Sequence, residues 1–169
     1  QFAALGDSSI KQIELELLKE KVLCTDATYT STDGVRSYIR NLTSDHAVRY
    51  YPMDSKTIEA CRLVDILNVY DGILVHDHET AMYHFGSGHA ECNVHLLRYL
   101  RKNSEETGNS WSAEMIRLLT DANSRRKELL QQEKFFTEEE SSRIIEQFEE
   151  LLAKGYRQNQ ETQHKYAAS

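Results

Sequence analysis

Two aspartates each follow a run of residues that favours a β-strand. Asp77 comes after the apolar run at residues 73–75, and Asp26 ends the run at residues 22–25, fifty-one residues earlier. Either aspartate alone is equally consistent with a cap on the turn that follows it. Two strand-borne carboxylates that converge, however, are the minimum for holding one or two divalent cations against a phosphate.

Histidine and cysteine form a second group of potential ligands. The group is His76, His78, His89, Cys92 and His95. A tetrahedral zinc site needs about four such nitrogen or sulfur ligands, so a structural zinc is one hypothesis. The other is that Cys92 lies in the core, as free cysteines commonly do, and that His95 faces an active site or DNA. Metal analysis of protein purified without chelator distinguishes the two.

Three basic residues follow this group at helical spacing. Arg98, Arg101 and Lys102 are placed at i, i+3 and i+4, and therefore share one face of a helix. They are candidates, together with His95, for contacts with DNA phosphates. A solvated helix face is the alternative interpretation.

The elements that must position these residues can be predicted from periodicity and turn chemistry. The pattern predicts strands at 22–30, 35–44, 47–53, up to Asp77, and 89–92. It predicts helices at 7–21, from 54–55 to about 67, at 93–102, at 112–132 and from Thr137, and a short helix or a turn at 79–85. Asp33-Gly34 predicts a hairpin turn, and Thr137 with Glu140 predicts a capping box. Gly155 is expected to end the last helix, with 156–169 as a continuation or a frayed tail.

At these residues the chain resembles a known family. The run CTDAT at 24–28, the run DGILVHDHETAMY at 71–83 and the block HAECNVHLLR at 89–98 are similar to the catalytic region of bacterial DDE transposases of the insertion sequence 66 family. The likeness spans about residues 22–102. It implies a ribonuclease-H-like α/β fold, in which three antiparallel strands are followed by parallel strands and flanked by helices.

The resemblance also implies roles for individual residues. Asp26 takes the place of the first catalytic acid and Asp77 that of the second, and both would bind Mg²⁺ or Mn²⁺. Cys92, His95 and Arg98 match the family's Cys-x-x-His-x-x-Arg block. Departures from the family pattern are Ala27 in place of a glutamate, Asn93 in place of an aromatic residue, and Leu97 and Tyr99 where basic residues are common.

The third catalytic acid of such transposases lies in an Asn-Asn-x-x-Glu-Arg type of segment, which does not occur before Ser169. We therefore expect this chain to be a fragment of a longer transposase, with weak metal affinity and no strand transfer of its own. The expected organisation is a lead-in helix at 1–21, an incomplete catalytic core at 22–105 and a helical insertion or extension at 106–169.

Composition and charge limit the partners. A net charge of −7 argues against a grip on DNA by this part alone, because phosphate neutralisation by Lys and Arg dominates such affinity. Transposon DNA is therefore expected to be held mostly by parts outside this chain, and self-association is a further expectation. The three cysteines and the lack of a long apolar run indicate a cytoplasmic protein without a membrane span. The alternative function is a zinc-binding or non-catalytic helical interaction module derived from a transposase.

Overall fold

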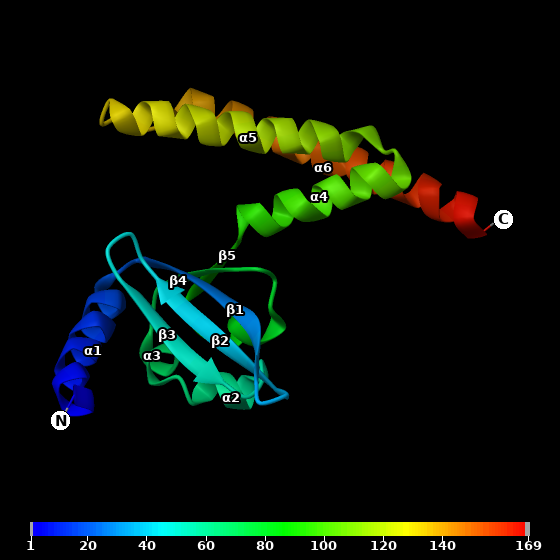
Figure 1. Ribbon diagram of the computed structural model, residues 1–169. Coiled ribbons are helices and arrows are strands. Elements are labelled where there is room, and N and C mark those ends of the chain that lie inside the picture. Colours follow the sequence, from blue (N-terminus) through cyan, green and yellow to red (C-terminus); the bar gives the residue numbers. More distant parts are fainter. Residues whose placement is uncertain (1, 168–169) are drawn as a thin grey trace. The chain divides into compact units, whose positions relative to one another are not determined.

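The computed structural model describes residues 2–167, with side chains described for 6–31 and 33–161. The chain divides into two compact units, residues 1–93 and 94–169 (Figure 1). The first unit holds all the strands, and the second consists of helices. Among the described helices, none is both long and apolar enough to cross a membrane.

A five-stranded sheet organises the first unit. The strands are β1 (Val22–Thr32), β2 (Val35–Thr43), β3 (Val48–Met53), β4 (Ile73–His76) and β5 (Gly88–Glu91), in the order β3-β2-β1-β4-β5. β1, β2 and β3 pair antiparallel, whereas β4 pairs parallel to both β1 and β5. The expected mixed sheet of three antiparallel strands followed by parallel strands is confirmed at this level.

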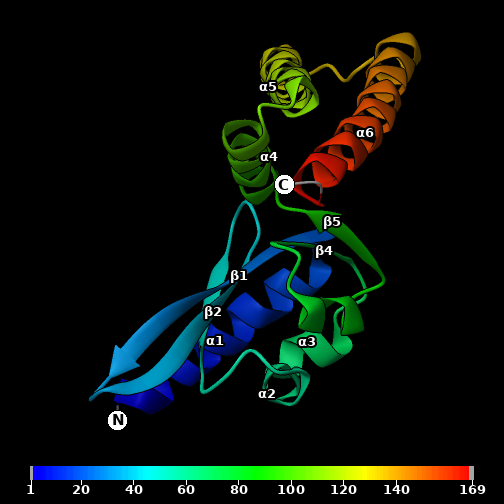
Figure 2. The same cartoon turned by 90° about the vertical axis from the view of Figure 1, so that its right-hand side faces the viewer.

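The hairpin between β1 and β2 turns where the sequence predicts it. Asp33 and Gly34 have φ values of 52° and 79°, the left-handed pair that a two-residue hairpin turn requires. Figure 2 shows the two strands twisting together as they approach this turn. β3 is an edge strand, which accommodates Pro52, the single proline, because an edge strand tolerates a missing backbone donor.

Helices cover one face of this sheet. They are α1 (Phe2–Lys19), α2 (Ile58–Arg62), α3 (Asp65–Val69) and the short 3₁₀ helix η1 (Thr80–His84). Leu17 of α1, Leu23 of β1, Leu42 of β2, Leu67 of α3 and Leu74 of β4 all lie in one buried cluster. Burying such side chains removes apolar area from water at about 25 cal/mol per Å², so this cluster supplies the main stabilisation of the unit.

The predicted single helix from residues 54–55 to about 67 is wrong. Two short helices are present instead, and α2 is capped by Thr57, whose side chain accepts a hydrogen bond from the Ala60 N–H at 3.3 Å. Val64 is extended between the helices, with φ −90° and ψ 94°. Asn68 stabilises this break because its side-chain amide donates to the carbonyl of Arg62, at 2.8 Å.

The opposite face of the sheet carries no helix of the first unit. Side chains alternate across each strand, so Cys24, Asp26 and Thr28 share the face opposite to buried Leu23 and Thr25. Cys24 is exposed on this face, so its thiol is not part of the core. We call this surface the open face of the first unit.

The second unit contains α4 (Asn93–Thr107), α5 (Ser110–Gln131) and α6 (Glu138–Ala167), with α4 starting at the boundary. α5 and α6 lie side by side as a helical hairpin (Figure 1). Lys154 of α6 donates to both carboxylate oxygens of Glu114 of α5, at 2.7 and 2.9 Å. The predicted capping box is present, because Glu140 N–H donates to Thr137 Oγ1 and Thr137 N–H donates to Glu140 Oε2.

Gly155 does not end α6, contrary to the prediction from sequence. The helix runs through it, and a Cβ at this position would lie 2.8 Å from the indole ring of Trp111. The glycine therefore serves the close packing of α6 on α5. Residues after 155 continue the helix to Ala167.

Candidate metal centre

Asp26 and Asp77 lie close together on the open face of the first unit. The parallel pairing of β1 with β4 joins Cys24 to Val75, and extending this register by two residues brings Asp26 level with Asp77. One carboxylate oxygen of Asp26 lies within 4.8 Å of one of Asp77. Both side chains are half-buried. This separation leaves room for a cation that both oxygens bind.

Asp26 is fixed by backbone hydrogen bonds on both sides. Its N–H donates to the side-chain oxygen of Asn41 on β2, at 2.8 Å. Its Oδ1 accepts from the N–H of Ala27, also at 2.8 Å. The first of these bonds ties the acid to the neighbouring strand, and the second limits rotation of the carboxylate.

Asp77 carries an oxygen whose hydrogen-bonding capacity is unused. Its Oδ1 is buried and accepts no hydrogen bond from the residues that the structure describes. A buried carboxylate oxygen without a partner is costly, and a divalent cation is a partner that removes the cost. The two carboxylates therefore fit Mg²⁺ or Mn²⁺, which prefer oxygen ligands.

A buried ionic network lies next to these acids on the helix-covered face. Arg40 of β2 is fully buried and pairs with Glu79, which is two residues after Asp77. Arg40 also donates to Thr25 Oγ1 at 3.1 Å, and Lys56 lies 3.5 Å from Glu79. No pattern in the sequence marks Arg40 or Glu79 as a functional residue.

A residue with left-handed backbone lies between the second acid and this network. His78 has a φ of 69°, in the left-handed region that side chains other than glycine rarely adopt. Its Nδ1 lies 2.8 Å from Glu91 Oε1 and 3.2 Å from the Tyr83 hydroxyl. The Tyr83 hydroxyl also donates to Glu91, at 2.6 Å. Contacts with Tyr83 and His78 hold the pKa of Glu91 below its usual range, which keeps this carboxylate charged.

His76 is the buried member of the histidine group. Its ring is 1% exposed and forms edge-to-face contacts with the rings of Tyr83 and His89. Neither ring nitrogen has a hydrogen-bond partner among the described side chains and backbone groups. Burial lowers the pKa of His76 because an imidazolium loses its hydration there.

The structure gives no support to the zinc hypothesis. Within the described part of the chain, no metal-binding group includes His76, His78, His89 or Cys92. His76 is buried against aromatic rings, whereas His78 is exposed and bonded to Glu91. Cys92 is half-buried rather than a core residue.

The residues expected to contact DNA all lie on α4, in the second unit. His95 is half-buried in its first turn, and Arg98, Arg101 and Lys102 are exposed. Lys102 lies 3.7 Å from Glu106, an exposed pair that contributes little to stability. The helical face predicted from their spacing is present, and its contact with DNA stays a prediction.

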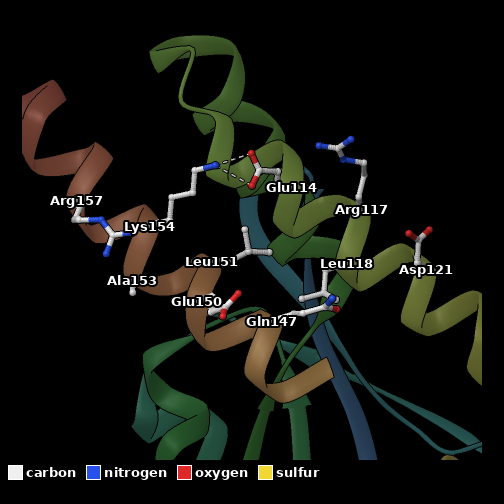
Figure 3. Close-up of a pocket in the computed structure, with 10 residues that line it drawn as sticks. All are labelled: Glu114, Arg117, Leu118, Asp121, Gln147, Glu150, Leu151, Ala153, Lys154 and Arg157. Carbon is white, nitrogen blue, oxygen red and sulfur yellow. Dashed lines mark hydrogen bonds and ion pairs between the residues drawn. The ribbon is translucent and has the colours of Figure 1, made fainter. Parts of the chain in front are cut away.

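A groove of about 680 Å³ lies between α5 and α6 (Figure 3). Its charged lining residues are Glu114, Arg117, Asp121, Glu150, Lys154 and Arg157. Figure 3 shows Lys154 reaching across to Glu114, so one basic side chain is already neutralised. A lining with three acids and three bases carries no excess positive charge, which makes the groove a poor phosphate site.

Comparison with known proteins identifies a family. A family model described as "Transposase IS66 family" matches residues 2–168 of the chain. Searches of the curated proteins and of the solved structures found no match.

Proposed function

Because the chain belongs to the transposase IS66 family, we propose that Asp26 and Asp77 are two of the acids of a DDE-type active site that cuts and joins DNA strands. The observation that carries the proposal is the approach of their carboxylate oxygens to within 4.8 Å. The order of strands and helices supports a ribonuclease-H-like identity for the first unit.

Asp26 and Asp77 would hold Mg²⁺ or Mn²⁺ from adjacent strands. Such ions, when bound, supply Lewis-acid stabilisation of a phosphate and lower the pKa of an attacking water or hydroxyl. The chain itself supplies the fixed geometry. Asn41 and Ala27 hold Asp26 in place, and Asp77 Oδ1 is kept free of competing hydrogen bonds.

The active site requires a third acid. Among the described residues, no other carboxylate joins Asp26 and Asp77 in a metal-binding group. We propose that this acid follows Ser169 in the full protein, and that two carboxylates alone bind metal weakly and do not transfer strands. The net charge of −7 supports the placement of the main DNA-binding surface elsewhere in the protein.

Metal titration of the chain tests the first part of the proposal. Free Mn²⁺ is followed by electron paramagnetic resonance as protein is added. Wild-type protein is expected to bind Mn²⁺, and Asp26→Asn and Asp77→Asn are each expected to weaken binding at least about tenfold, or ~1.4 kcal/mol. Asp33→Asn is the matched control because asparagine suits the left-handed position in the hairpin turn. Equal Mn²⁺ binding by all four proteins contradicts the proposal.

Self-association through the second unit is a second candidate function. Ile145, Leu152 and Tyr156 of α6 are 57%, 37% and 72% exposed, and their spacing places them along one stripe of the helix. An apolar stripe of this kind favours packing against another copy of α6. Light scattering during size-exclusion chromatography tests it: a dimer that Leu152→Glu dissociates supports the candidate, and a monomeric wild type removes it.

A further inference from the structure

Arg40 occupies a position where a cation is unexpected. It lies on β2 with its side chain on the helix-covered face, between the buried Leu42 and the core methionine Met82. The side chain is 0% exposed, and Glu79 is its only described carboxylate partner. A buried ion pair often contributes no more stability than apolar residues of the same volume. Stability therefore does not explain this pair.

A chain of hydrogen bonds leads from Arg40 to the first acid. The Arg40 guanidinium donates to Thr25 Oγ1 at 3.1 Å, and Thr25 Oγ1 donates to the carbonyl of Asn41 at 2.8 Å. The Asn41 side chain then accepts from the N–H of Asp26. These hydrogen bonds connect Arg40 to the part of β1 and β2 that carries Asp26.

Arg40 also pairs with Glu79, which lies two residues after the second acid. In a regular strand, residues 77 and 79 would point to the same face. Here Asp77 shares the open face with Asp26, whereas Glu79 reaches Arg40 on the covered face. The chain changes face at His78, whose backbone is left-handed. The ion pair with Arg40 then fixes Glu79 on the covered face.

We propose that Arg40 and Glu79 are positioning residues that fix Asp77 relative to Asp26, so that the two carboxylates stay within reach of one cation. Neither residue belongs to the metal-binding group that contains Asp26 and Asp77. The pair acts by joining the backbone after β4 to the backbone of β1 and β2. This inference rests on the proposed metal-binding function of the two aspartates. Residues of this kind, which orient metal ligands, typically change metal affinity 10- to 100-fold when altered.

A double variant, Arg40→Met with Glu79→Leu, separates positioning from stability. Removing one partner alone leaves an unpaired buried charge and can unfold the protein, whereas removing both replaces the pair with apolar side chains. We expect the double variant to melt close to the wild type but to bind Mn²⁺ about 10- to 100-fold more weakly. Amide hydrogen exchange at residues 77–79 is expected to become faster.

The matched control makes the same chemical change in the second unit. Lys154→Met with Glu114→Leu removes an ion pair of 2.7 Å that lies within the second unit. Its Mn²⁺ affinity and its exchange at residues 77–79 should equal those of the wild type. If the first double variant also shows wild-type affinity and exchange, the positioning role is wrong, while the metal site itself stands. If the wild type binds no Mn²⁺ but exchange at 77–79 still rises in the double variant, the proposed function fails and the structural coupling remains.

Discussion

Asp77 and Glu79 are two residues apart but serve opposite faces of the sheet. Asp77 approaches Asp26 on the open face, and Glu79 pairs with buried Arg40 on the covered face. The single residue between them, His78, has a φ of 69°. The geometry of the candidate metal centre therefore depends on one left-handed residue.

His78→Val tests this dependence. A β-branched side chain pays roughly 1–2 kcal/mol in the left-handed region, so His78→Val should destabilise the first unit by about that amount and weaken Mn²⁺ binding. His78→Gly adopts the same φ without strain and should keep Mn²⁺ affinity near that of the wild type. Urea unfolding and Mn²⁺ titration measure both. Equal effects of valine and glycine would mean that the His78 side chain matters rather than its backbone.

The lowered pKa of His76 predicts that the stability of the folded protein depends on pH. Burial is the main reason that its pKa is lowered, with Glu91 and His89 acting in opposite directions. The folded protein therefore holds His76 neutral at pH values where the unfolded chain, with a histidine pKa of about 6.5, already binds a proton. The stability contribution is complete above pH ~6.5 and is lost as pH falls towards the lowered pKa.

His76→Phe removes this titration while keeping an aromatic ring beside Tyr83 and His89. The free energy of unfolding, measured by urea denaturation at several pH values, should fall less between pH ~7 and ~5 in the variant than in the wild type. His46→Phe is the control, because His46 is exposed. Parallel pH profiles for wild type and His76→Phe would refute the assignment.

Turn chemistry and alternation predict the local elements well. Asp33-Gly34 specifies its hairpin because the requirement for positive φ is local. The approach of Asp26 to Asp77 is different, since it depends on β1 pairing with β4. Only the fold that the family resemblance implies points to that pairing, because nothing in the composition of either strand selects the other as its neighbour.

The sequence gives little sign of the network behind the acids. Alternation in β2 does place Arg40 with Tyr38 and Leu42, but a basic residue argues for solvent on that face. Its partner Glu79 is thirty-nine residues away, in a segment predicted as a turn or short helix. Local pattern cannot reveal a charge whose burial depends on a distant partner.

Gly155 illustrates the same limit in the second unit and yields a prediction. Local propensity favours a helix end at glycine, whereas packing against Trp111 requires glycine within the helix. Gly155→Val should destabilise the hairpin by roughly 1–3 kcal/mol, because the indole or the backbone must move. Trp111 is the only tryptophan, so its fluorescence reports both the displacement and the unfolding.

Gly6→Ala provides the control for a glycine in a helix. A Cβ at Gly6 meets nothing within 4 Å, so alanine should stabilise α1 by up to about 1 kcal/mol through helix propensity. If Gly155→Val leaves both the fluorescence and the melting curve unchanged, the close approach of α6 to Trp111 is wrong.

Removing the capping box at the start of α6 is expected to destabilise the second unit. Thr137 Oγ1 accepts from the N–H of Glu140 at 3.1 Å, and alanine cannot replace this acceptor. Thr137→Ala should therefore cost about 1 kcal/mol in the free energy of unfolding. Ser142→Ala, inside the same helix and exposed, should be neutral or slightly stabilising. Circular dichroism during urea unfolding compares the two variants, and an equal midpoint for both would show that α6 does not depend on its cap.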